Sequence, residues 1–293
     1  MVMARNVWLL LKDTFEAFIA DDALSRGASI AYYTLFSLAP VLLVVIAVAG
    51  LSFGPEAAQG AVVQQLGLLM GPKTAEALQA MIESAARPRE GLWATIVGIV
   101  VLLIATTGVF GEVQSAMNAI WKARPPAEST TLSRLVRARI ASLGLVATAG
   151  FLLTVSLATS AGLAAMADYL RIIFPAVQVM LNVVDVLVSG ALIAGLFAAM
   201  YKILPDALIA WRDVAIGAGA TMLLFEGGKY AIALYVGQSD VASSYGAAGA
   251  LIVLLVWIYY SAQIFLLGAE FTRSFAKRFG SHAQGEVAVP GGG

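Results

Sequence analysis

The sequence predicts an all-α membrane protein with six transmembrane helices and with both termini in the cytoplasm. Composition, long apolar segments and the placement of basic residues each support this fold class. Of its 293 residues, 60% are hydrophobic and 12% are charged, whereas soluble domains contain roughly 45–50% apolar and about 25% charged residues. Polar side chains are therefore too few to cover a water-soluble surface, and several stretches offer no polar face.

Charge and histidine content argue against several classes of function. The 18 basic residues balance 18 acidic ones, so no net positive field attracts nucleic acid. The chain has no cysteine and a single histidine, His282, which argues against disulfides and against cysteine- or histidine-based metal and catalytic sites. Phosphate-loop, zinc-protease and serine-hydrolase motifs are also missing from the sequence. We therefore expect no nucleic-acid partner, metal, cofactor or enzymatic activity, and ATP-driven transport would need a separate subunit.

Six segments of the chain are long and apolar enough to cross a membrane. A helix needs about 20 mostly apolar residues to cross the roughly 30 Å hydrocarbon core, because it rises about 1.5 Å per residue. The six segments span residues 31–53, 92–111, 140–166, 178–201, 213–236 and 246–270. Pro40 interrupts the first of them, and we expect it to bend that helix.

Basic residues set the predicted orientation of the six helices. Cytoplasmic loops retain Lys and Arg, whereas acidic residues contribute little to orientation. Thirteen Lys and Arg fall in the two termini and the second and fourth loops, and four fall in the loops on the opposite side. The side with thirteen is therefore predicted to be cytoplasmic. Adding or removing one helix would destroy this alternation, so the count also supports six.

The N-terminal residues 1–24 are predicted to form an amphipathic helix. Its apolar side chains recur at helical spacing, while Lys12, Asp13 and Glu16 take the other face. The apolar set is Val7, Trp8, Leu11, Phe15, Phe18 and Ile19. Two interpretations remain open: the helix lies on the cytoplasmic membrane surface, or it packs against the ends of the bundle.

Residues 54–91 form the longest predicted outer loop. We expect two short amphipathic helices there, broken at Gly71-Pro72, because proline after glycine stops a helix. These helices either cover the outer mouth of a cavity or rest at the membrane interface. Together with the N-terminal helix and this loop, residues 1–280 are predicted to be one six-helix domain, followed by a disordered, glycine-rich tail at 281–293.

Three ionisable residues lie near the middle of predicted spans, namely Asp185, Glu226 and Lys229. A charge at this depth costs roughly 2.5–3.5 kcal/mol on insertion scales, so it normally faces a partner or a water-filled cavity. Glu226 and Lys229 are three residues apart and can pair on one helix face. The alternatives are a neutralised pair without further role, or a polar pathway that includes Asp185. Gly227 and Gly228 favour close helix packing or bending at the same place.

Four segments resemble the YihY/BrkB family of bacterial inner-membrane proteins. They are AYYTLFSLAPVLLVV at 31–45, GEVQSAMNAIW at 111–121, YKILPDALIAWRDVAIGA at 201–218 and YGAAGALIVLLVWIYYSAQIFLLGAEFTR at 245–273. The resemblance covers about residues 20–275 and implies a six-helix protein of the bacterial inner membrane. The family-motif positions, whose role is unknown, are Tyr32, Tyr33, Ser37, Pro40, Asn118, Trp121, Pro205, Gly268 and Glu270.

Many sequences of this family carry the label ribonuclease BN, which this sequence does not support. A metal-dependent nuclease needs clustered carboxylates or histidines outside the membrane, and an RNA-binding protein needs a basic face with exposed aromatics. We instead expect a transporter or flippase-like protein for an amphiphilic or anionic envelope solute. The alternative is a non-transporting scaffold or assembly factor. Membrane lipids are the expected partners, together with an envelope protein in the second case.

Overall fold

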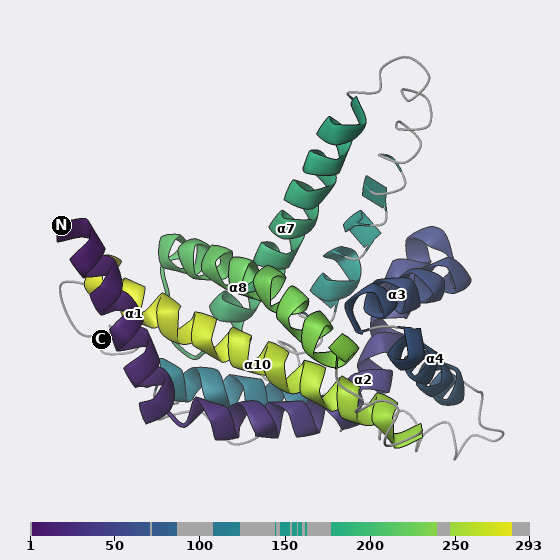
Figure 1. Cartoon of the computed structure of the whole chain (residues 1–293), viewed down its shortest axis with the longest axis horizontal. Coiled ribbons are helices and arrows are strands. Elements are labelled where there is room, and N and C mark those ends of the chain that lie inside the picture. Colours follow the sequence, from purple (N-terminus) through teal and green to yellow (C-terminus); the bar gives the residue numbers. More distant parts are fainter. Residues whose placement is uncertain are drawn as a thin grey trace, which may run out of the picture.

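Helices make up all the regular structure in the part of the chain that the computed structural model describes (Figure 1). That part comprises residues 2–70, 72–86, 108–123, 144, 147–152, 154–156, 158–159, 162, 177–238 and 247–282. No strand occurs among these residues. The all-α class predicted from the sequence is therefore confirmed for them.

The first two helices, α1 (Val2–Ala20) and α2 (Ala23–Phe53), are joined by the turn Asp21-Asp22. Asp22 has a φ of 54°, a left-handed conformation that ends α1 and that aspartate tolerates better than most residues. α2 then runs for 31 residues and includes Pro40. Gly54 follows it with a φ of 85°, a conformation that only glycine adopts at little cost.

The predicted outer helices are present as α3 (Pro55–Met70) and α4 (Pro72–Ala86). Each begins with proline, whose fixed φ and missing N–H suit the first helical position. Their apolar faces are buried against neighbouring helices: α3 packs against α2, and α4 against both α2 and α10. The side chains buried in these contacts include Ala49, Ala58, Val62, Leu78, Ile82 and Leu254. The apolar faces of α3 and α4 thus cover other helices of the chain.

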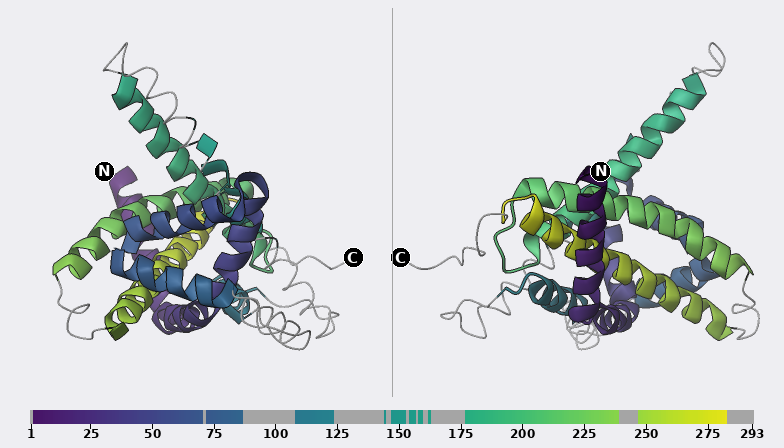
Figure 2. Two further views of the ribbon diagram at one scale, coloured as in Figure 1. Left: turned by 90° about the vertical axis from the view of Figure 1, so that its right-hand side faces the viewer. Right: turned by 60° about the vertical axis from the view of Figure 1, so that its left-hand side comes forward.

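Helix α10 (Ala247–Arg278) lies at the centre of the described structure. It contacts α8 (Trp211–Gln238), α2, α1 and α4. Helix α7 (Val177–Ile203) packs against α8 near its C-terminal end, and its N-terminal part projects beyond the other helices that Figure 1 labels (Figures 1 and 2). Charged side chains from several helices meet along the C-terminal half of α10, described below.

In the described part of the chain, three helices are long and apolar enough to cross a membrane, in the regions Ala23–Ser52, Val186–Ile203 and Gly249–Arg278. They correspond to the first, fourth and sixth predicted spans. Helix α8 has the length for the fifth, with 28 residues, but Glu226 and Lys229 lower its hydropathy. Most of the second and third predicted spans, 92–111 and 140–166, lies outside the described residues. The count of six and the orientation therefore stay predictions.

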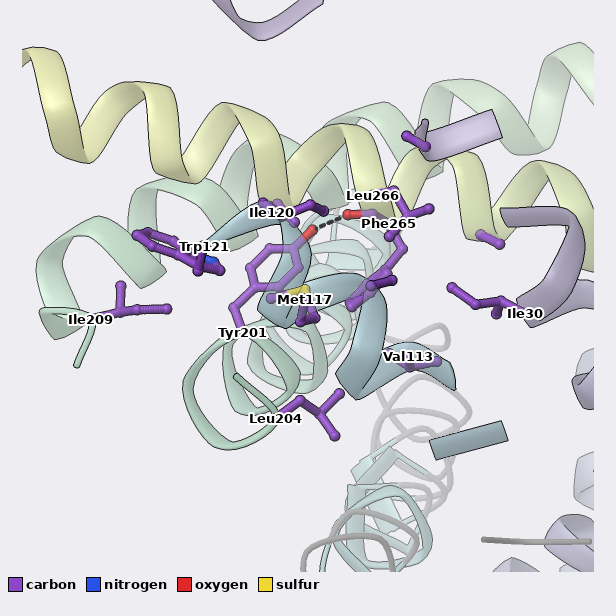
Figure 3. Close-up of a cluster of buried hydrophobic side chains, with 14 of the residues drawn as sticks. Ile30, Val113, Met117, Ile120, Trp121, Tyr201, Leu204, Ile209, Phe265 and Leu266 are labelled. Atoms are coloured by element: carbon purple, nitrogen blue, oxygen red, sulfur yellow. Dashed lines mark hydrogen bonds between the residues drawn. The ribbon is translucent and has the colours of Figure 1, made fainter. Parts of the chain in front are cut away.

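The largest buried core surrounds the C-terminal half of α10 (Figure 3). It combines side chains from the helical residues 108–120, the end of α7, the start of α8 and α10. Its members include Val113, Met117, Ile120, Trp121, Tyr201, Leu204, Ile209, Phe265 and Leu266. Three of the four family-like segments thus meet in one place.

Candidate functional site

Glu226 and Lys229 form an ion pair on α8. Lys229 Nζ lies 2.7 Å from Glu226 Oε2. The Glu226 side chain is 34% exposed, and the Lys229 side chain is 26% exposed. The pair is therefore not enclosed between α8 and the helices that pack on it. Asp185, the third residue of the predicted pathway, lies on α7, but its side chain is outside the described residues. The structure brings together two of the three predicted residues and leaves the position of the third untested.

The two glycines beside the ion pair have different surroundings. Gly228 is buried, and a Cβ there would overlap the hydroxyl of Tyr260 and lie 2.8 Å from Ile264 Cδ1, both on α10. Gly227 is exposed, with nothing within 4 Å of the position of a Cβ. Gly228 thus permits close approach of α10, while Gly227 leaves open surface next to Glu226.

Tyr201 joins α7 to both α8 and α10, and residue-by-residue reasoning from the sequence did not single it out for this role. Its side chain is fully buried. Its hydroxyl donates to Phe265 O at 2.8 Å and lies 2.9 Å from Thr221 Oγ1 (Figure 3). Gly268 provides the space for this contact, because a Cβ there would overlap the hydroxyls of both Tyr201 and Thr221. In the sequence, Tyr201 opens the family-like segment 201–218, and the four-residue spacing of Gly217 and Thr221 is typical of close helix contacts.

Asn118 connects the helical residues 108–120 to the turn after α7. Its side-chain amide donates to Asp206 Oδ2 at 2.9 Å, and its side-chain oxygen accepts from Asp206 N at 2.7 Å. Gln114 adds a weaker contact to the same carboxylate, at 3.4 Å. Lys202 closes the turn by donating to Ile209 O at 2.5 Å. The family-motif position Asn118 therefore holds the turn that contains the buried family-motif position Pro205.

The end of α10 is bound to the start of α8 through Asp213. The backbone N–H and the hydroxyl of Ser281 donate to Asp213 Oδ2, at 3.1 and 2.6 Å. Ser281 Oγ also lies 3.0 Å from His282 Nδ1, and the His282 ring is 6.1 Å from that of the buried Trp121. Serine stands between the carboxylate and the imidazole, whereas nucleophilic triads place histidine between the other two. This arrangement fastens a helix end and does not activate Ser281.

A second charged cluster joins α10 to the turn between α1 and α2. Asp21 accepts from Lys122 and, at 3.3 Å, from Arg273 Nη1. The same guanidinium nitrogen lies 3.9 Å from Glu270 Oε2. Glu270 is fully buried. The family-motif position Glu270 thus belongs to a network of two acids and two bases drawn from three parts of the chain.

Among the described residues, no three His, Asp or Glu side chains gather in a way that could hold a metal ion. Apart from Glu270, the polar groups described above are instead paired with amides, hydroxyls and basic side chains. Their arrangement ties helix ends together and places one ion pair on the surface of α8.

Comparison with known protein families gives a match over most of the chain. The sequence pattern of the family described as "Virulence factor BrkB" matches residues 14–289. The chain belongs to the BrkB family. Among the relatives of this BrkB-family protein are UPF0761 membrane proteins of Alcanivorax borkumensis, 30% identical over 88% of the chain, and of Azotobacter vinelandii, 29% identical over 87%. A UPF0761 membrane protein of Pseudomonas aeruginosa is 29% identical over 86% of the chain.

The BrkB-family chain spans about three fifths of the length of these relatives, namely 58%, 60% and 59% of the three in the order given. No solved structure matches it. The names of the three relatives describe them as membrane proteins, in agreement with the three apolar helices in the described part of this chain. The chain is thus a membrane protein of the BrkB family.

The remaining motif positions of this BrkB-family protein lie along α2. Tyr32 and Tyr33 are exposed and pack edge to face, with ring centroids 5.6 Å apart. Ser37 is buried and donates to Thr34 O at 3.3 Å. Because Pro40 has no N–H, the carbonyl of Phe36 lacks its usual helical donor. The Ser37 hydroxyl does not replace that donor, since it bonds to Thr34 O. Tyr33 also lies against Gly108, so this part of α2 faces the start of the helical residues 108–120.

Proposed function

We propose that this BrkB-family protein is a transporter or flippase-like protein for an amphiphilic or anionic solute, without ATP hydrolysis of its own. In this proposal it crosses the bacterial inner membrane six times with both termini in the cytoplasm. Solute passes along α8, where Glu226 and Lys229 face it. The partly exposed ion pair of α8 is the observation that carries the proposal.

Energetics favour a role for this pair beyond stabilising the fold. Two unpaired charges at membrane depth would together cost roughly 5–7 kcal/mol on insertion scales, and pairing recovers only part of that cost. Two leucines would instead favour insertion by a few tenths of a kcal/mol each. The fold at this position therefore does not need the charges, because α10 contacts α8 through Gly228 and leaves the pair at the edge of that contact. A zwitterionic pair next to the open surface at Gly227 suits a solute that carries an anionic group and an apolar part.

A charge swap distinguishes a transport role from simple neutralisation. The purified protein is reconstituted into liposomes that contain a fluorescent anionic phospholipid, and its movement between leaflets is followed by chemical quenching from outside. Neutralising the pair by Glu226→Gln with Lys229→Gln should lower the rate at least about ten-fold, equivalent to about 1.4 kcal/mol of lost stabilisation. Swapping the charges, with Glu226→Lys and Lys229→Glu, keeps a neutral pair for insertion but should also lower the rate.

The matched control is the exposed pair Lys12–Glu16 on α1, with side chains 56% and 66% exposed. Neutralising it by Lys12→Gln with Glu16→Gln should leave the rate unchanged. Asp185→Asn tests the third predicted residue and should lower the rate in the same direction. Full activity of the charge-swapped protein would show that the pair only neutralises itself. Wild-type liposomes without lipid movement above protein-free ones would favour the scaffold alternative.

A further inference from the structure

The charged cluster between α10 and the α1–α2 turn contains one acid that accepts hydrogen bonds from two basic side chains and one that accepts none from the described residues. The partnered acid is Asp21. Its carboxylate accepts hydrogen bonds from Lys122 of the segment 108–123 and from Arg273 of α10. Its backbone carbonyl accepts from Arg26 Nε of α2 at 2.9 Å. Each carboxyl oxygen of Asp21 therefore accepts a bond from one basic side chain.

Glu270 has no comparable partners. It is completely buried, and neither of its carboxyl oxygens accepts a hydrogen bond from any donor in the described part of the chain. Arg273 Nη1 lies 3.9 Å from Glu270 Oε2, which exceeds the hydrogen-bonding range of about 2.7–3.2 Å. The same nitrogen is already bonded to Asp21. An ionised Glu270 would thus be a buried anion without a donor, which is an expensive state.

The charged groups around Glu270 come from each element that packs on it. They are Asp21 from the α1–α2 turn, Lys122 from the segment 108–123, and Arg273 and Lys277 from α10. The basic groups attract a negative charge on Glu270, but Lys122 and Arg273 bond to Asp21, and the exposed Lys277 is screened by water. Asp21, the neighbouring carboxylate, opposes a second negative charge beside it.

We propose that Glu270 binds a proton and shares it with Asp21, so that the junction of α1, α2 and α10 is a proton-binding site. A neutral carboxylic acid carries one O–H donor, and the adjacent Asp21 carboxylate accepts it. One proton thereby removes the uncompensated charge and supplies the missing donor. A metal ion does not suit this position, because two basic side chains already occupy the space around the two carboxyl groups.

Infrared difference spectroscopy on the full-length protein in liposomes tests the site without measuring transport. At neutral pH, exposed carboxyl groups are ionised, so a protonated carboxyl C=O stretch reports a site that retains its proton. The wild type should show this band, lose it as the pH is raised, and regain it on return to neutral pH. Glu270→Gln should lack the band, whereas Glu16→Gln, which removes an exposed acid of α1, should retain it.

Asp21→Asn provides a second and independent readout. It removes the neighbouring negative charge and frees Arg273 to bond to Glu270, so the band should disappear at a lower pH than in the wild type. This shift decides the question even where Glu270→Gln fails to fold. A band that persists in Glu270→Gln, or a titration that Asp21→Asn does not move, would overturn the proposal. Neither result depends on whether the protein moves a solute.

Discussion

Glycine and threonine alternate across the contact between α8 and α10. Gly217 of α8 faces the Thr272 side chain of α10, and Gly268 of α10 faces the Thr221 side chain of α8. Both threonines donate to a carbonyl four residues earlier in their own helix, Gly217 O at 2.8 Å and Gly268 O at 2.6 Å. Each threonine thus satisfies its hydroxyl within its own helix while its bulk fills the space over the opposite glycine. Small residues of this kind let helix backbones approach closely in a membrane.

Substitution of Gly268 should test this contact most directly. Gly268→Ala places a methyl group against the hydroxyls of Thr221 and Tyr201, and such overpacking typically costs about 1–3 kcal/mol. We expect a lower apparent melting temperature for the detergent-solubilised protein. Gly227→Ala is the matched control, since nothing lies within 4 Å of its Cβ position; it should be neutral or stabilise by up to about 1 kcal/mol. Equal melting temperatures for the two variants would contradict the packing described for Gly268.

At the scale of single elements, α1 has three distinct faces. One face, with Leu10, Thr14 and Phe18, is buried, and α1 packs mainly on α10. A second carries charged residues, of which Asp13 pairs with Arg278 at the end of α10 at 2.5 Å. The third presents large apolar side chains to the outside: Val7, Trp8, Leu11, Phe15 and Ile19. One face of α1 thus packs on another helix of the chain, and the location of its apolar outer face at the membrane surface stays a prediction.

The exposed apolar face of α1 is expected to lie in the headgroup region of the membrane. Trp8 is 66% exposed, and amphipathic helices of this kind bury their apolar face about 5–10 Å into the lipid boundary. Lipid-attached quenchers placed near the headgroups should therefore quench Trp8 fluorescence more than quenchers near the bilayer centre. The Trp8→Phe protein supplies the background of the other tryptophans, including the buried Trp121. Stronger quenching from the bilayer centre, or none from either depth, would refute this placement.

Helix existence was predictable from the sequence, whereas contacts between distant residues were not. Apolar length indicated α2, α7 and α10, and Gly71-Pro72 located the break between α3 and α4, because these signals depend on neighbours along the chain. The pairing of Asn118 with Asp206 joins residues 88 apart, and no local pattern encodes it. Hydropathy also cannot decide which face of a helix meets lipid and which meets protein, since both are apolar.

At the scale of the whole molecule, the predicted orientation places α3 and α4 outside and α1 inside. The absence of cysteine from the sequence makes this testable with single introduced cysteines. A membrane-impermeant maleimide should label Ser84→Cys of α4 in intact spheroplasts, because Ser84 is exposed. It should label Lys12→Cys of α1 only after the membrane is permeabilised. The unmodified protein is the blank, and the reverse labelling pattern would invert the topology.

Tyr201 also determines how α7 can move within this molecule. Its hydroxyl touches α8 and α10 at once, so a rotation or slide of α7 at this point breaks both contacts. The N-terminal part of the same helix projects beyond the other helices that Figure 1 labels (Figures 1 and 2). A movement of α7 that keeps both contacts must therefore turn about Tyr201.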